Sequence, residues 1–430
     1  MKKILLTTIS LYILSFSQVF ALLETQKVNL EEALDIALKA NPQMKINALS
    51  TEVAKNNIKA VSSFQNPEFQ SNFNIGETGK GEPQTLGLSY TFEVLKRGKR
   101  KQVAKSEYKY AQNRQNYNEV QFIFEVKKAY INFLLKKSNL KLLSEQADLT
   151  KEILEHIEKE AKKGKLPQTD VVQAKIASNR AIMLYRVAKS EMISAQNKFN
   201  TVLNANQIDY DIKEDSLNDD YAKLMTIKPD AKFYNFDEIK KYTLENREDL
   251  KSYQNLVEAK KKKLNVVKSK LIPDLEFHGG YGVKSRGMSE TNHTISGAYA
   301  GVNITNIPLV YRYQPEIKNA LIEIEQAELK YRDVKIDITR DVTDAWEKFS
   351  IARDTLIFYN ENLLPNSKEL QQTSRQSLLN NKIDLTSYLI TKKVYLELIL
   401  NYQQALSDYY LSYAELLMEM GIGKNKIEKL

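Results

Sequence analysis

The chain has 430 residues, of which 42% are hydrophobic and 27% are charged, and it contains no cysteine. This composition excludes an intrinsically disordered chain and a protein with many transmembrane helices, while the missing cysteines exclude disulfides, Cys-ligated metals and a thiol nucleophile. The formal net charge of +9 is small for this length, so nucleic acid is not an expected partner.

Residues 1–21 have the pattern of an export signal. Lys2 and Lys3 precede an apolar run from Ile4 to Phe16, and small residues follow near Ala21. A transmembrane anchor is the alternative, but the run is short and is interrupted by Thr and Ser residues. We therefore expect a signal peptide at 1–21 and a mature chain that leaves the cytoplasm.

Glycine and proline divide the rest of the chain into long helices and two short strand regions. Eleven of the 14 glycines lie in two windows, 76–98 and 279–301. Elsewhere helix breakers are rare, which predicts long helical hairpins over 101–203 and 315–420. In the first hairpin the apolar residues recur at three-to-four spacing, with an interruption at Lys127, and this narrow seam is typical of coiled coils.

The two glycine-rich windows alternate apolar and polar residues with period two, which predicts strand pairs over 67–92 and 273–306. Such segments suit the strands of a membrane barrel with a wet lumen, although half-buried hairpins of a soluble domain have the same pattern. The export signal favours the outer membrane. On this interpretation the first strand pair lines the lumen with Glu68, Gln70, Asn72, Asn74, Thr85, Ser89 and Thr91.

The two halves of the chain are repeats. Residues 29–67 and 235–273 align without a gap and share nine of 39 positions, and matches continue through the later helices at an offset of 216 to 217 residues. Both repeats are expected to begin at an Asn N-cap, with Glu three residues later. The predicted organisation is a signal peptide (1–21), a first repeat (22–203), a polar connector (204–234), a second repeat (235–421) and a tail (422–430).

One chain supplies about four strands, whereas the smallest membrane barrels need about eight. A single chain therefore cannot close a barrel, and we expect several copies to assemble. Two copies would supply eight strands and three copies twelve; the sequence does not choose between them.

Six motifs follow one another along the chain: Leu30-Glu-Glu-Ala-Leu34, Asn41-Pro42, Asn66-Pro67-Glu68, Arg97-Gly98-Lys99-Arg100, Gly164-Lys-Leu-Pro-Gln-Thr-Asp170-Val-Val-Gln-Ala174 and Ala414-Glu-Leu-Leu-Met-Glu-Met-Gly421. In this order they resemble the TolC-like outer membrane efflux family over nearly the whole mature chain. The Asn-Pro-Glu and Gly-Lys-Arg patches look most like the branch that serves heavy-metal cation exporters.

The resemblance implies a mixed α and β fold in which each chain gives four strands to a trimeric transmembrane β-barrel and long helices to a coiled-coil periplasmic tunnel. It also implies a Gram-negative outer membrane location, a homotrimer in contact with lipid, a periplasmic adaptor protein and an inner-membrane transporter that is driven by protons. The implied function is a passive exit duct in a tripartite efflux system, with heavy-metal cations as one implied cargo.

In the family, the two turns of the helical hairpins form the periplasmic tips that adaptors contact. The corresponding residues here are Gly164, Lys165, Leu166, Thr169, Asp170, Asn381, Lys382, Ile383, Thr386 and Ser387. Gly164 would also appear in any helical hairpin, and Thr169 with Asp170 would also cap any following helix. Some relatives carry acidic residues at the second tip, where this chain has Ser387 and Ile390, so an acidic ring there is not expected.

No motif of an enzyme, phosphate-binding loop, cofactor site or metal site is present, so we expect neither catalysis nor a bound cofactor. The three histidines, His156, His278 and His293, are expected on solvated or lumen-facing surfaces. The basic runs 97–101 and 260–263 are expected on a solvated face near the membrane.

Three functions fit the sequence. The leading one is the efflux duct, with drugs or type I secreted proteins as alternative cargo. A structural periplasmic coiled-coil protein is the second. A phage or toxin receptor that uses a loop near residues 284–293 is the third.

Overall fold

The structure is a computed structural model that describes residues 24–72, 83–205, 208–213, 235–284, 296–380 and 382–423. These residues form two compact units. The hairpin unit contains Met1–Met44, Glu119–Thr243 and Asp341–Leu430, and the sheet unit contains Lys45–Asn118 and Leu244–Arg340. The predicted signal peptide, Asn74, Asn381, His293, the proposed receptor loop and most of the connector lie outside the described residues.

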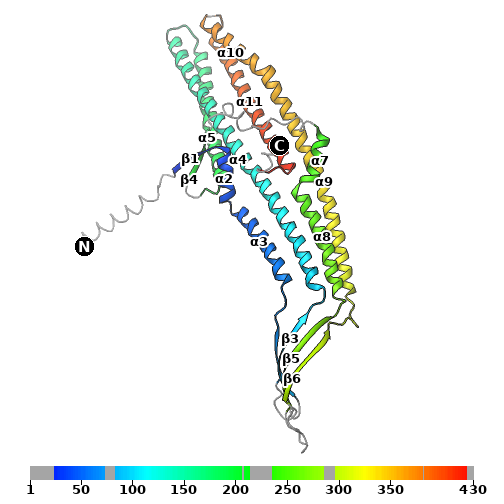
Figure 1. Cartoon of the computed structure of the whole chain (residues 1–430). Helices are drawn as coiled ribbons and strands as arrows, with labels where there is room; N and C mark the ends of the chain where they lie inside the picture. Colours follow the sequence, from blue (N-terminus) through cyan, green and yellow to red (C-terminus); the bar gives the residue numbers. More distant parts are fainter. Residues whose placement is uncertain are drawn as a thin grey trace, which may run out of the picture. The chain divides into compact units, whose positions relative to one another are not determined.

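Long helices make up most of both units (Figure 1). They are α2 (Leu30–Ala40), α3 (Pro42–Ser62), α4 (Lys96–Lys162), α5 (Gln168–Val202), α7 (Phe236–Asn246), α8 (Glu248–Ser269), α9 (Gln314–Phe358), α10 (Leu364–Leu379) and α11 (Leu385–Glu419). Within the described residues, no helix has the length and apolarity needed to cross a membrane.

The helix boundaries repeat. The pair α2 and α3 corresponds to α7 and α8 at the offset found in the sequence, and both pairs are interrupted after eleven residues, at Asn41 and at Arg247. A π-helical turn, Tyr359–Leu363, joins α9 to α10, and Pro365 is the second residue of α10. The predicted mixed fold with internal duplication is confirmed.

The first predicted N-cap is a full capping box. The Asn29 side chain accepts a hydrogen bond from the Glu32 N–H, and the Glu32 carboxylate accepts one from the Asn29 N–H. At the start of the second repeat, Asn235 Oδ1 accepts a hydrogen bond from the Asp237 N–H instead, at 3.1 Å. The two repeats thus begin in similar but not identical ways.

One antiparallel sheet of four strands belongs to the sheet unit (Figure 1). Its order is β2 (Glu68–Asn72), β3 (Pro83–Phe92), β5 (Asp274–Lys284) and β6 (Ser296–Thr305). The two predicted strand pairs are therefore adjacent hairpins, joined where β3 pairs with β5. Each hairpin comes from one repeat.

A second, parallel pair joins β1 (Glu24–Val28) to β4 (Ile208–Ile212) in the hairpin unit. The sequence did not predict either strand, because β4 lies in the segment that reads as a polar connector. Val28 and Ile212 are buried against the core of the hairpin unit, and Lys137 donates to the Asp211 carboxylate at 3.2 Å. The connector therefore begins with a strand that is tied to the helices.

The core of the hairpin unit is wider than the narrow seam predicted from the sequence. Phe122, Val126, Tyr130 and Phe133 of α4 are buried with residues of α2, α5, α11, β1 and β4. A narrower cluster around Ile157 and Ala174 continues towards the α4–α5 turn. The coiled-coil description thus fits the distal part of the hairpin, and a layered core fits the middle.

Candidate functional site

The strand register places polar and apolar side chains on opposite faces of the four-stranded sheet. Glu68 lies opposite Ser89, Ser89 opposite His278, and His278 opposite Gly301. Because directly paired residues share a face, this row and its alternate neighbours form one polar face. The polar face carries Glu68, Gln70, Asn72, Thr85, Ser89, Thr91, Glu276, His278, Tyr299 and Asn303.

The structure thus brings six of the seven predicted lumen residues to one face of the sheet, and the seventh, Asn74, lies outside the described residues. Gln70 Nε2 donates to Ser89 Oγ at 2.9 Å across β2 and β3. Ser89 is only 3% exposed. The polar face is therefore an organised, hydrogen-bonded surface.

The opposite face is apolar and uncovered. Phe69, Leu88, Phe277, Tyr281 and Val302 are 46% to 66% exposed although each lies in the ordered part of a strand. A contiguous exposed apolar face of this kind marks a surface that meets another protein or lipid. Together with the polar face, it reproduces the two-sided pattern of a lipid-facing strand.

Glycines on the polar face make room for two rings. A β-carbon on Gly87 would lie 2.6 Å from the Tyr299 hydroxyl oxygen, and one on Gly301 would lie 2.5 Å from His278 Nε2. The His278 and Tyr299 ring centroids are 6.2 Å apart. These glycines thus let His278 and Tyr299 lie flat over the neighbouring strands, a role that the alternation pattern alone did not assign.

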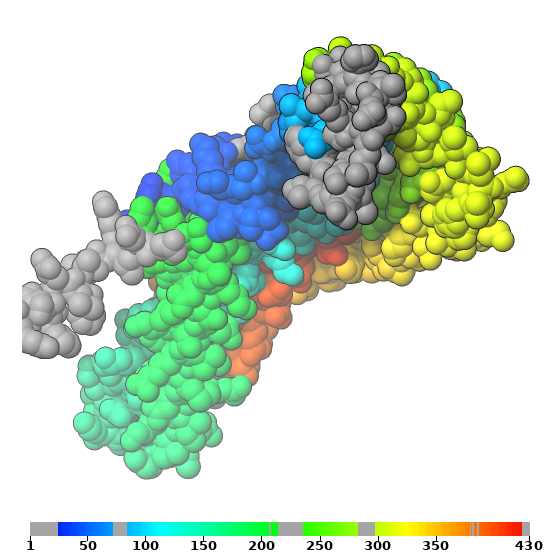
Figure 2. All heavy atoms as spheres, turned by 90° about the horizontal axis from the view of Figure 1, so that it is seen from below, coloured from blue at the N-terminus to red at the C-terminus, as the bar shows by residue number. Residues whose placement is uncertain are grey.

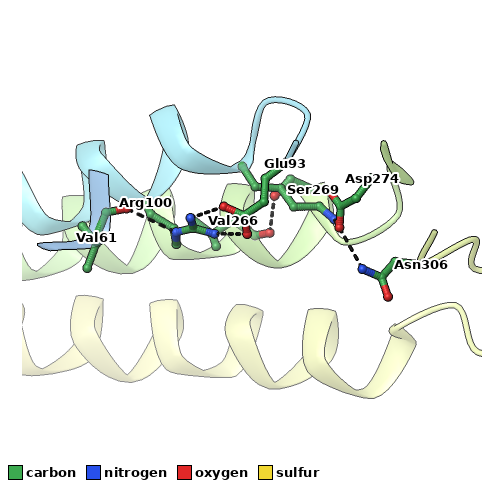
Figure 3. Close-up of polar contacts among 8 residues, drawn as sticks. Val61, Glu93, Arg100, Val266, Ser269, Asp274 and Asn306 are labelled. Atoms are coloured by element: carbon green, nitrogen blue, oxygen red, sulfur yellow. Dashed lines mark hydrogen bonds and ion pairs between the residues drawn. The ribbon is translucent and has the colours of Figure 1, made fainter. Parts of the chain in front are cut away.

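The strands and helices of the sheet unit meet at a polar junction (Figure 3). Lys96 Nζ at the start of α4 donates to Asp274 Oδ2 at the start of β5, at 2.7 Å, and Asn306 Nδ2 donates to the same oxygen at 2.8 Å. The side chains of Lys96 and Asp274 are only 11% and 5% exposed. Arg100 binds both oxygens of Glu93 nearby and donates to the Val61 carbonyl at 3.4 Å.

Both basic runs contain side chains with partners inside the sheet unit, while Lys101, Lys261 and Lys263 are exposed, in keeping with the expected solvated face. In the first run, Arg100 is paired with Glu93, and the Arg97 guanidinium lies 3.8 Å from the Phe64 ring centroid. In the second, Lys260 and Lys263 both bind Glu323 of α9, at 2.8 and 2.9 Å. These hydrogen bonds lower the pKa of Glu323. The second run therefore fastens α8 to α9.

The first hairpin turn connects α4 to α5 through residues 163–167. Gly164 has a φ of +75°, a left-handed conformation that ends the helix and that other residues adopt at a cost. Lys163 and Lys165 both bind Glu160, at 2.6 and 3.2 Å, which lowers the pKa of that carboxyl. Leu166 packs beside the cluster of Ile153, Ile157 and Ala174.

Thr169 and Asp170 lie in the first turn of α5, but neither is its N-cap. Pro167 occupies the N-cap position and makes no side-chain hydrogen bond. The structural role that we considered for Thr169 and Asp170 as a cap is therefore wrong. Asp170 instead lines a groove of about 430 Å³ formed by α4, α5 and α11, whose wall includes Ile176, Leu389 and Ile390.

The second hairpin turn connects α10 to α11. Asp384 is the N-cap of α11, because its Oδ1 accepts from the Ser387 N–H at 3.0 Å, and this bonding lowers the pKa of Asp384. Lys382 and Ser387 are exposed, and Ile383 is half-buried. Of the other predicted tip residues, Asn381 and the side chain of Thr386 are outside the described residues.

The sequence reasoning missed Asp384, an exposed carboxylate in the second turn. The signal was present as an Asp immediately before an apolar-periodic run, the usual N-cap pattern. Glu276, Tyr299 and Asn303 were also omitted from the predicted lumen residues, since their window alternates less regularly than the first. Among the described residues, no group of three His, Asp or Glu side chains is placed to hold a metal ion.

Known structures with the same fold include outer membrane channels. The chain aligns with CusC, described as a transmembrane channel, at 14% identity and a TM-score of 0.72, with 92% of each chain covered. It aligns with the CmeC outer membrane channel of Campylobacter jejuni at 17% identity and a TM-score of 0.68, covering 93% of this chain and 88% of that one. The MtrE outer membrane channel of Neisseria gonorrhoeae in its open state gives 13% identity and a TM-score of 0.70, with 92% and 90% covered.

No curated protein sequence matches the chain. The family model described as outer membrane efflux protein matches residues 33–205 and 241–415, one stretch in each repeat and together most of the chain. The two-faced sheet, the duplicated helical hairpins and this match agree. The chain is a transport channel of the outer membrane and belongs to the outer membrane efflux protein family.

Proposed function

We propose that this protein is the outer membrane exit duct of a tripartite efflux system. Three copies combine their strands in the membrane and their helical hairpins in the periplasm. A periplasmic adaptor connects the duct to an inner-membrane transporter, which uses the proton gradient. Heavy-metal cations are the proposed cargo, following the resemblance of the Asn-Pro-Glu and Gly-Lys-Arg segments.

The single observation that carries this proposal is the inverted burial in the sheet. Large apolar side chains such as Phe69 and Val302 are exposed, while Ser89 on the other face is buried. In water such a face is unfavourable, at roughly 25 cal/mol per Å² of apolar surface. In a membrane the apolar face contacts the hydrocarbon chains of the lipid, which removes this cost. The polar face then lines an aqueous passage.

Exposed apolar residues on the helices support assembly from several copies. In the sheet unit, Leu321, Leu329 and Ile336 of α9 are 50% to 68% exposed. Figure 2 shows the yellow atoms of α9 at the surface of the visible face, uncovered by other segments. Such positions are suited to contact a second copy of the chain along its length.

The proposed duct moves cargo without chemistry of its own. Its lining is made of hydroxyl, amide and carboxylate groups on the polar face, and these offer no enclosed site of high affinity. Energy and selection therefore come from the inner-membrane transporter, and the duct supplies a continuous aqueous path.

We further propose that the two hairpin turns are the adaptor-docking tips. In the first turn Gly164, Lys165, Leu166, Thr169 and Asp170 form the tip, and in the second Lys382, Ile383 and Ser387 do so with Asn381 and Thr386. Exposed Lys165, Lys382 and Asp384 give each tip a charged, solvated surface. Leu166 supports the turn from inside through the cluster of Ile153 and Ile157.

The duct proposal is tested with a deletion strain and with fractionation of the expressed protein. The expected result is an oligomer that is extracted from outer membranes only by detergent, together with increased sensitivity of the deletion strain to toxic divalent or monovalent metal cations. If the deletion strain were sensitive to antibiotics but not to metal cations, drugs and not metals would be the cargo. A chain recovered in the aqueous periplasm would favour the structural coiled-coil protein and contradict the duct.

The docking proposal is tested by reversing charge at a tip. Lys382→Glu should reduce export severalfold and leave the oligomer intact, because this side chain is exposed and outside the core. Lys189→Glu on α5, also exposed but far along the helix from the turn, is the matched control and should export normally. Unchanged export by Lys382→Glu combined with Lys165→Glu would contradict the docking role.

A further inference from the structure

The loop between β6 and α9, residues 306–313, carries the most exposed large apolar side chains of the described chain. Val310 is 99% exposed and Leu309 is 77% exposed, and Ile307 and Tyr311 on either side are about half exposed. Apolar side chains clustered in this way are unfavourable in water, and such a patch marks a surface that meets a partner. The loop therefore needs an apolar surrounding that one chain does not supply.

Hydrogen bonds hold this loop in place. At its start, Asn306 Nδ2 donates to Asp274 Oδ2 at 2.8 Å (Figure 3). Near its end, the Tyr311 hydroxyl donates to Glu316 Oε2 at 2.7 Å, and the rings of Tyr311 and Tyr313 have centroids 5.1 Å apart. The apolar side chains between these two anchors are therefore held in their exposed position.

The corresponding transition in the first repeat, from β3 to α4, also exposes an apolar side chain. Leu95 is 65% exposed and has a φ of +61°, a left-handed conformation that is unfavourable for a residue with a side chain. The next residue, Lys96, binds the same Asp274 oxygen as Asn306 does. Leu95 and the loop therefore lie at the same end of the sheet, and backbone strain at an exposed residue is typical of functional positions.

Basic side chains accompany these apolar residues. Arg312 belongs to the loop and is exposed, with no hydrogen-bond or ion-pair partner in the part of the chain that the structure describes. Lys270, at the end of α8, has its Nζ 5.5 Å from the ring centroid of Tyr313. On the side of the first repeat, the Arg97 guanidinium lies 3.8 Å from the ring centroid of the exposed Phe64. Cations thus stand beside exposed apolar groups in both repeats.

The nearby acidic groups do not neutralise these cations. The carboxylates of the two junction ion pairs are occupied by their own partners. Glu316 accepts the hydroxyl hydrogen bond of the loop and attracts Lys270 electrostatically. Glu68 and Glu276 belong to the polar face of the sheet, opposite the apolar residues. Arg312 therefore remains without a counter-ion among the described residues, and the loop attracts an anion.

The loop continues the apolar face of the sheet. Val302 and Ile304 of β6 belong to that face and are exposed, and the strand ends one residue later. The long helices begin beyond the loop, so in an outer membrane channel that extends into the periplasm this end of the sheet meets the periplasmic leaflet. Apolar and aromatic residues beside basic ones are the pattern of an anchor at a membrane interface.

We propose that the loop and Lys270 form a binding site for an anionic phospholipid of the periplasmic leaflet. Leu309 and Val310 enter the boundary of the acyl chains, while Arg312 and Lys270 bind the phosphate of the headgroup. A guanidinium can bind two phosphate oxygens at once, and a zwitterionic headgroup offers the cations no net charge. The inference rests on the proposed duct, with its strands in the membrane, and adds a lipid that fixes the depth of the duct.

Lipid contact is tested with a fluorophore at the tip of the loop. The natural chain has no cysteine, so Val310→Cys can be labelled alone with an environment-sensitive dye. In vesicles of phosphatidylcholine and phosphatidylglycerol, phospholipid with a spin label near the head of its acyl chain should quench most of the emission. Lys189→Cys, at an exposed position of α5, is the matched control and should keep its emission, because the long helices lie in the periplasm.

The choice of headgroup is tested by attaching the spin label to either lipid. With the dye at position 310, spin-labelled phosphatidylglycerol should quench about fivefold more effectively than spin-labelled phosphatidylcholine, the effect of roughly one cation near a membrane surface. Arg312→Gln with Lys270→Gln should abolish this preference. Lys189→Gln with Lys198→Gln removes two exposed charges from α5 and should leave it unchanged. Equal quenching by both lipids in the natural charge background would overturn the anionic site.

The outcomes separate this inference from the proposed function. A dye at position 310 that neither lipid quenches would overturn the lipid site, and a blue-shifted emission without quenching would identify a second copy of the chain as the occupant. Either result leaves the duct intact if the protein is still an oligomer extracted by detergent. A chain recovered in the aqueous periplasm would contradict the duct and the lipid site together.

Discussion

The sheet and the helical core of this chain use the same apolar residue types in opposite ways. In the hairpin unit Phe199 and Phe133 are fully buried, with ring centroids 5.7 Å apart. In the sheet unit Phe277 and Val302 are 46% and 56% exposed, while Ser89 is 3% exposed. The helical core is built to exclude water, and the sheet is built to present its apolar face to an apolar surrounding. The two regions therefore respond differently to the same substitution.

The largest effect is expected from truncating an aromatic residue in the helical core. Phe349 is fully buried and contacts the rings of Trp346, Tyr409 and Tyr413. Phe349→Ala should lower the free energy of unfolding by about 3 to 5 kcal/mol through lost burial and a cavity. Chemical denaturation in detergent measures it.

Phe277→Ala on the sheet is the control for that truncation. It should lower the free energy of unfolding by less than Phe349→Ala does, because the Phe277 side chain is 46% exposed within one chain. If Phe349→Ala and Phe277→Ala lowered the free energy of unfolding equally, the proposed difference between the helical core and the sheet would be contradicted.

A smaller but more specific effect is expected from a charge on the sheet. Val302 and Asn303 are neighbours on β6, both exposed, and they lie on opposite faces. Val302→Arg should destabilise membrane assembly by about 2 kcal/mol, because it places a charge in lipid. Asn303→Arg should assemble normally and alter ion conductance. Folding into lipid vesicles and single-channel recording give the two readouts, and the reverse ranking would mean that the faces are assigned the wrong way round.

The smallest effect is expected at the imperfect position of the helical seam. Lys127 on α4 is half-buried, and burial lowers its pKa from the ordinary value of 10.5. The charged form therefore destabilises the folded state below the lowered pKa, and this cost disappears as the pH rises to 10.5. Lys127→Met should raise the free energy of unfolding by about 1 kcal/mol at neutral pH.

The gain from Lys127→Met over the natural chain should shrink towards pH 10.5, and denaturation curves of both proteins at several pH values measure it. A gain that is independent of pH would assign the effect to packing and not to the buried charge.

Much of the fold could be predicted because its signals are local. The glycine windows and the period-two alternation located all four strands of the sheet, and Gly164 located the first hairpin turn.

The remaining features depend on contacts between distant segments. The parallel pair of β1 and β4 joins residues far apart in sequence, and β1 has little alternation to reveal it. The pairing of Lys96 with Asp274 likewise has no local signature, and the sequence did not predict it.

The central claim is that four strands per chain are completed by other copies of the same chain. The most direct test is the mass of the protein extracted from outer membranes in detergent, measured by light scattering with the detergent contribution subtracted. The account predicts particles of three chains. A monodisperse single chain that stays in solution without detergent would contradict it.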